Sequence, residues 1–153
     1  MPETREELTF SPPADFQKRA HIKSIEQYRE MHERSIKDPE GFWGEQAERL
    51  DWVEKWDRVL EWNFEEPRIE WFKGGKLNAS VNCLDRHVAA GRGGDVAIIF
   101  EGNDPSVARS ITYAEMLTEV CRCANALRAL GIQKGDRVCI YMPMIPEAVY
   151  AML

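Results

Sequence analysis

The residue types best suited to acid–base chemistry lie together at Asp85-Arg86-His87, where a carboxylate and an imidazole flank a guanidinium. Successive residues of a helix point about 100° apart, so the carboxylate and the imidazole do not converge on one point. The local sequence places no serine or cysteine nucleophile for them to activate, as a catalytic triad requires. We therefore favour an exposed or interface His87 over a catalytic one.

A glycine cluster with one basic residue, Gly91-Arg92-Gly93-Gly94, is a candidate for phosphate binding. Phosphate loops connect a strand to the amino terminus of a helix, where free backbone N–H groups meet the anion. This cluster instead precedes a predicted strand, which is the wrong order. We favour a flexible turn over a nucleotide site.

Two further segments have side chains in positions that can serve a ligand. Glu101 and Asp104 have oxygens for a cation, but a turn rich in Gly, Asn, Asp and Pro is explained by backbone preference alone. Residues 141–146, with the sequence Tyr-Met-Pro-Met-Ile-Pro, follow a predicted strand at the edge where α/β sheets bind ligands. Because these side chains are apolar or structural, we favour a proline-shaped loop before the next helix over direct contact with substrate.

The four cysteines lack the paired spacing of a zinc knuckle, and no histidine stands at finger spacing from them. They are Cys83, Cys121, Cys123 and Cys139. Cys121 and Cys123 are two residues apart and point to different sides of a helix. We expect buried, reduced thiols and no metal site.

Composition limits the kinds of partner. The 153 residues contain 20 Lys and Arg against 26 Asp and Glu, a formal net charge of −6. This balance argues against binding to nucleic acid or to an anionic membrane through bulk charge. The acidic residues 1–7 lead into no apolar stretch, and no run approaches the ~20 apolar residues that span a bilayer. The length permits one compact domain. We expect no signal or transit peptide and a cytoplasmic location.

The elements that position these residues begin with short helices. Residues 1–21 contain two consecutive prolines and no sustained period, so we expect an extended leader. Ser24 caps an amphipathic helix with Gln27 three residues on. A second helix begins at Asp38, with Pro39 in the first helical position.

The middle of the chain is rich in tryptophan. We expect these large aromatic side chains to anchor a loop-rich segment in the core rather than to stack on a ligand. They are Trp52, Trp56 and Trp62. A hairpin is predicted with its turn at Lys73-Gly74-Gly75. A helix follows, with an apolar face made of Leu77, Val81, Leu84 and Val88.

The last third predicts a strand, a crossover helix and a second strand. Val96–Phe100 is a continuous apolar run typical of a buried strand, and a short strand is predicted near residues 109–111. Thr112 and Glu115 form a capping box for the longest helix. Its predicted apolar stripe is Leu117, Val120, Cys121, Ala124 and Leu127. With Arg137–Met142 as the second strand, the pattern is a βαβ unit, which favours a parallel sheet and an α/β fold.

The segment Thr112-Tyr113-Ala114-Glu115 and residues 131–148 resemble the opening of the acyl-adenylate-forming enzymes. Upstream signatures narrow the resemblance to the acetyl-coenzyme A synthetase family. They are residues 38–47, 77–79, 82–87 and 100–102. The resemblance implies a leader over 1–21, a family-specific helical subdomain over 22–90, and the start of an AMP-binding α/β domain with an incomplete sheet over 91–153.

Members of that family join acetate to coenzyme A in two steps, through acetyl-adenylate and with release of pyrophosphate and then AMP. The resemblance therefore implies ATP, coenzyme A and Mg²⁺ as cofactors and acetate as substrate. It implies no nucleic-acid or membrane partner.

The family's phosphate loop, acetate pocket, coenzyme A residues and adenylation lysine are not found between Met1 and Leu153. We expect no catalytic, cofactor-binding or metal residue in this chain, which would be only the amino-terminal part of such a ligase. Alone, it is expected to be inactive and to bind none of the cofactors tightly. Two alternatives stay open: a ligase for propionate or another short acid, and a non-catalytic remnant or interaction module.

Overall fold

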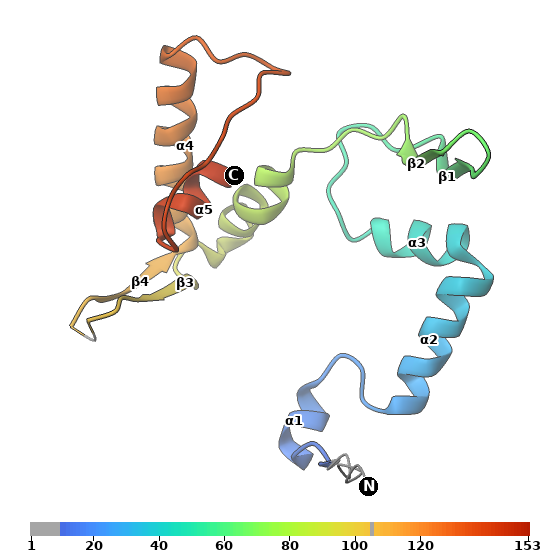
Figure 1. Ribbon diagram of the computed structural model, residues 1–153. Coiled ribbons are helices and arrows are strands. Elements are labelled where there is room, and N and C mark those ends of the chain that lie inside the picture. Colours follow the sequence, from blue (N-terminus) through green and yellow to red (C-terminus); the bar gives the residue numbers. More distant parts are fainter. Residues whose placement is uncertain (1–9, 105) are drawn as a thin grey trace, which may run out of the picture. The chain divides into compact units, whose positions relative to one another are not determined.

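The computed structural model describes residues 10–104 and 106–153. The chain divides into two compact units (Figure 1). One extends to Arg49 and includes Asp57–Lys73, and the other combines Leu50–Trp56 with Gly74–Leu153. Each unit has its own antiparallel pair of strands, β1 with β2 in the first and β3 with β4 in the second.

Three helices begin the first unit: α1 (Ala14–Arg19), α2 (Ile25–Lys37) and α3 (Pro39–Ala47). The expectation of an extended leader is wrong over Ala14–Arg19. There Asp15 lies in the first helical turn and two basic residues lie in the last, an order that suits the helix dipole. Residues 1–9 of the expected leader lie outside the described residues.

Both predicted helix starts are confirmed. The Ser24 hydroxyl accepts a hydrogen bond from the Gln27 amide at 3.1 Å. Asp38 Oδ1 accepts one from the Gly41 amide at 3.0 Å, with Pro39 in the first turn. A Cβ at Gly41 would lie 2.2 Å from Asp38 Oδ2, so glycine is required for this cap to close as it does.

Replacing the cap of α3 tests this local account. Asp38→Ala is expected to lower the free energy of unfolding by about 0.5–2 kcal/mol, because the first turn loses its side-chain acceptor. Glu65→Ala, which removes an exposed carboxylate in a hairpin turn, serves as the control and should change it by less than about 0.5 kcal/mol. Urea denaturation followed by circular dichroism measures both. Equal losses in the two variants would contradict the cap.

The hairpin lies elsewhere than predicted. It consists of β1 (Arg58–Asn63) and β2 (Arg68–Lys73), with a turn at residues 64–67. The Asn63 side chain accepts a hydrogen bond from the Glu65 amide at 2.9 Å, which fixes the turn where the sequence has no glycine to mark it. Gly74, at φ 81°, instead follows the end of β2.

The tryptophans do not share one environment. Trp62 is 62% exposed, so the expectation that it anchors a core is wrong. Trp52 and Trp56 are half-buried and meet edge to face, with ring centroids 4.9 Å apart. In the first unit Trp71 of β2 makes a similar contact with Trp43 of α3, at 6.3 Å. Ring pairing alone does not bury a tryptophan, because Trp43 and Trp71 are still 43% and 44% exposed.

The predicted helix after Leu77 forms, but with wide turns. Val81–Asp85 (η1) and Val88–Arg92 (η2) are π-helical, and Gly91 has φ 79°. Of the predicted stripe, Leu84 is 1% exposed whereas Val81 is 38% exposed. A π turn contains more residues than an α turn. Residues chosen at α-helical spacing therefore do not all lie on one face of this helix.

Buried Asn82 secures this helix. Its Oδ1 accepts a hydrogen bond from the Asp51 amide at 2.8 Å, and its Nδ2 donates to the Asp51 carbonyl at 3.0 Å. The paired bonds satisfy a polar side chain that is only 6% exposed.

The rest of the second unit is a hairpin followed by two helices: β3 (Val96–Glu101), β4 (Ala108–Thr112), α4 (Tyr113–Ala129) and α5 (Pro146–Met152). β3 pairs with β4 in antiparallel orientation. Within the described residues, Arg137–Met142 forms no strand, so the predicted βαβ unit is not seen. A parallel strand needs a neighbour far away in sequence, whereas a hairpin partner is only a turn away.

The core of the second unit joins Leu84, Ile111, Met116 and Val120. On α4 the predicted stripe is partly wrong: Cys121 and Ala124 are exposed, and Met116 is buried. Cysteine burial was also overestimated, because Cys83, Cys121 and Cys139 are exposed and Cys123 is intermediate. None of the helices in the described part of the chain has the length and hydropathy needed to cross a membrane.

Candidate functional site

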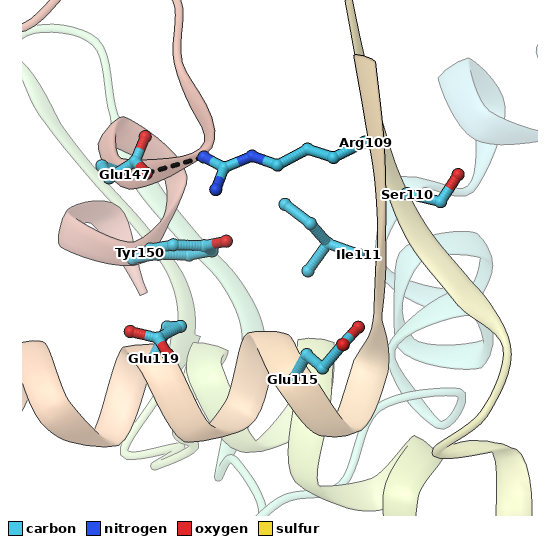
Figure 2. A pocket seen from close by; sticks show the side chains of 7 residues that line it. All are labelled: Arg109, Ser110, Ile111, Glu115, Glu119, Glu147 and Tyr150. Carbon is cyan, nitrogen blue, oxygen red and sulfur yellow. Dashed lines mark hydrogen bonds and ion pairs between the residues drawn. The ribbon is translucent and has the colours of Figure 1, made fainter. Parts of the chain in front are cut away.

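A hollow of about 530 Å³ opens where β4, α4 and α5 meet (Figure 2). Its lining residues come from all three elements: Arg109, Ser110, Ile111, Glu115, Glu119, Glu147 and Tyr150. Figure 2 shows the Arg109 side chain reaching toward Glu147, with Ile111 and Tyr150 between this pair and α4. One guanidinium and three carboxylates therefore share the hollow.

The ion pair dominates the electrostatics of the hollow. Arg109 Nη2 donates to Glu147 Oε1 at 2.7 Å. This hydrogen bond is the main reason why the pKa of the Glu147 carboxyl lies below its ordinary value and the pKa of Arg109 lies above its own. Burial raises the pKa of the neighbouring Tyr150 hydroxyl.

The capping box predicted from the sequence is confirmed, and it engages Glu115. Thr112 Oγ1 accepts from the Glu115 amide at 3.3 Å, and the Thr112 amide donates to Glu115 Oε2 at 2.8 Å. The hydrogen bond from that amide lowers the pKa of Glu115. The amino terminus of α4, which would attract an anion if free, is closed by its own side chains.

The hollow is poorly suited to phosphate chemistry. Its positive group is neutralised by Glu147, and two more carboxylates face the same space. Stabilising charge that develops on phosphorus needs positioned cationic or N–H donors. Nor does the described part of the chain bring together three or more His, Cys, Asp or Glu side chains that could hold a metal ion.

The Asp85-Arg86-His87 segment lies across from the start of α4. The His87 ring is 5.1 Å from the Tyr113 ring, and the Arg92 guanidinium lies 5.8 Å from the same ring. Arg92 Nε also pairs with Asp95 at 2.9 Å. These contacts are those of a packed junction between two helices and a strand.

The glycine cluster lies at the end of η2. The Gly93 carbonyl accepts a hydrogen bond from the Ala114 amide at 3.0 Å, which ties this turn to α4. Arg92 is directed to Asp95 rather than to a glycine-lined cavity.

The two remaining candidates lie apart from the hollow's lining. Asp104 Oδ1 accepts from the Ser106 amide at 2.9 Å and from its hydroxyl at 2.8 Å, and the amide bond lowers the pKa of Asp104. Glu101 ends β3. Tyr141 is 100% exposed and Met144 is 94% exposed, in a segment without helix or strand. The helix start at Pro146 is confirmed.

Sequence reasoning missed the Arg109–Glu147 pair. The two residues are 38 positions apart, and neither stands in a motif that names a partner. Arg109 was expected on a short strand and Glu147 at a helix start, and both placements are right. Only the packing of α5 beside β4 brings their charges together.

Two family models match the chain in succession. Residues 85–153 match the family described as AMP-binding enzyme, and residues 28–83 match the family described as acetyl-coenzyme A synthetase N-terminus. The carboxy-terminal part of the chain thus matches the class of AMP-binding enzymes.

Curated relatives narrow the class. An acetyl-coenzyme A synthetase from Syntrophus aciditrophicus is 55% identical over 148 residues, which is 96% of this chain and 23% of the relative. One from Parvibaculum lavamentivorans is 55% identical over 146 residues, 94% of this chain and 22% of the relative. The chain belongs to the acetyl-coenzyme A synthetase family. It spans less than a quarter of the length of these relatives.

Proposed function

We propose that this chain is the amino-terminal region of an AMP-forming acetate:CoA ligase. Such an enzyme makes acetyl-CoA from acetate, ATP and coenzyme A through acetyl-adenylate. The observation that carries this proposal is the order of the two family matches, the synthetase amino terminus over 28–83 and the AMP-binding family over 85–153. Relatives named acetyl-coenzyme A synthetase that match nearly the whole chain support it.

Within that enzyme, the residues described here serve as framework and carry out no chemical step. The hollow beside β4 supports this assignment, because its one cation is paired and its remaining charges are negative. ATP, coenzyme A, acetate and Mg²⁺ would be held by other parts of the ligase. No nucleic-acid or membrane partner is proposed, and the proposed location is the cytoplasm.

The finer architecture is also a proposal. Residues 22–90 form the family-specific subdomain and 91–153 begin the AMP-binding domain. The change of family match between 83 and 85 supports a boundary in this part of the chain. Arg137–Met142 becomes a strand of a parallel sheet when neighbouring strands are available. Its run of Val138, Ile140 and Met142 at every second position supports this.

Two alternatives differ in what they predict. A ligase for propionate or another short acid would share this region, because the acyl pocket lies elsewhere in the family. A non-catalytic remnant or interaction module would act by docking on a complete synthetase. We favour the acetate ligase because the Syntrophus and Parvibaculum relatives, each 55% identical to this chain, are named for acetate.

The expected result for the isolated chain is the absence of catalysis. Purified residues 1–153 should show no acetate-dependent exchange of pyrophosphate into ATP above a protein-free blank. The Syntrophus aciditrophicus synthetase, assayed in parallel, is the positive control. Exchange that survives repurification of the 153-residue chain would overturn the framework role.

A chimera tests the ligase assignment itself. Replacing the matching 148 residues of the Syntrophus relative with those of this chain should leave acetate-dependent exchange in place. A folded but inactive chimera would contradict the proposal. Inhibition or stimulation of the intact synthetase by the separate chain would favour the interaction module instead.

A further inference from the structure

Helix α5 is joined to the rest of its unit by a long irregular segment. Residues 131–145 run from α4 to α5 without helix or strand. α5 has seven residues, and its N-cap, Ile145, offers no side-chain hydrogen bond. Helices this short are marginal alone, so the position of α5 depends on tertiary contacts.

Those contacts are of two kinds. Val149, Tyr150 and Leu153 pack against the core cluster that contains Ile111 and Met116. The Arg109–Glu147 ion pair, at 2.7 Å, links the first turn of α5 back to β4. The segment from residue 109 to residue 147 is thus a loop, and one charge-assisted hydrogen bond joins its two ends.

Arg109 also contacts β3. Its guanidinium lies 5.7 Å from the centre of the Phe100 ring on β3, so one side chain connects β3, β4 and α5. Other carboxylates of the hollow are engaged elsewhere: Glu115 in the capping box and Glu119 with Arg122 at 2.6 Å. Glu147 is the carboxylate that takes the Arg109 charge (Figure 2).

We propose that the Arg109–Glu147 pair is a latch that keeps α5 closed over the core of the second unit. When the latch opens, α5 and the segment before it leave the core together and uncover the side chains that Val149 and Leu153 contact. This inference stands independently of the proposed ligase function, because it concerns only contacts within the second unit.

The latch is also sensitive to acid. The pKa of Glu147 is lowered in the folded chain, mainly by the Arg109 hydrogen bond. The stabilisation is therefore complete above the ordinary carboxyl value of 4.5 and is lost as the pH falls through the lowered pKa. Glu115 and Glu119 from α4 and Tyr150 from α5 face the same hollow. Tyr150, with its raised pKa, stays neutral in this range.

Hydrogen exchange of the 153-residue chain, followed by mass spectrometry, tests the latch at neutral pH. In Arg109→Met, amides of residues 147–153 should exchange about two- to fivefold faster, as expected for loss of a half-exposed ion pair. The charge-exchanged double variant, Arg109→Glu with Glu147→Arg, should recover part of the protection. Arg34→Met, which breaks a half-exposed ion pair with Glu45 in the first unit, is the matched control and should leave α5 unchanged.

Three results would overturn the proposal. One is unchanged exchange over residues 147–153 in Arg109→Met. Another is an equal acceleration over α4 and α5, which would mean general destabilisation rather than a released helix. The third is rapid exchange of the α5 amides in the unaltered chain, because the ion pair would then not be holding α5 in place.

Discussion

Leu84→Ala is expected to lower the free energy of unfolding by about 2–5 kcal/mol, the largest effect of any single substitution considered for this chain. Leu84 is 1% exposed and packs in the cluster with Ile111, Met116 and Val120. Truncation removes apolar contact and leaves a cavity in the core. Urea denaturation of both proteins, followed by circular dichroism, gives the difference.

Leu130→Ala is the matched control for that measurement. Leu130 follows α4 and is 80% exposed, so the same change of side chain should cost less than about 0.5 kcal/mol. If the two substitutions lower the free energy of unfolding equally, the second unit does not have its core where the structure places it.

The second large effect concerns association of the isolated chain. Residues 137–142 carry Val138, Ile140 and Met142, which are 49%, 39% and 50% exposed. No backbone hydrogen bond within the described residues involves this segment. An apolar segment whose backbone N–H and C=O groups are unpaired can pair as a strand with the same segment of another molecule. We expect the 153-residue chain to self-associate through it, and amides over residues 138–142 to exchange rapidly when the chain is dilute.

Ile140→Lys should return the chain to a monomer, because a charge in the middle of the segment opposes pairing. Sedimentation velocity across a series of protein concentrations measures the change. Leu130→Lys adds the same charge at an exposed leucine outside the segment and should not alter association. An unaltered chain that stays monomeric at every concentration, or two lysine variants that behave alike, would show that another surface is responsible.

Features that depend on near neighbours were predictable from the sequence. The caps at Ser24, Asp38 and Thr112 each join a side chain to an amide three residues on, so their geometry follows once the helix exists. Pro146 at the start of α5 is local in the same way. The family signatures could also be recognised from the sequence, because each consists of adjacent residues.

Features that depend on distant partners were not predictable. The turn at residues 64–67 is local and was missed for another reason: it lacks the glycine that drew the expected hairpin to Lys73-Gly74-Gly75. The stripe on α4 shifted to Met116 because the elements packed against α4, which are α5, η1 and β4, decide which of its faces is covered. Trp62 is of a residue type that is usually covered, but it is 62% exposed.

By itself, the sequence determined the helix boundaries at their caps, the run of apolar residues in β3, and membership of the acetyl-coenzyme A synthetase family. Tertiary structure alone decided the residues that fill the core and the Arg109–Glu147 pair. The reason is the range of the interactions: a cap closes over three residues at little entropic cost, whereas a contact across 38 residues exists only when packing brings its two ends together.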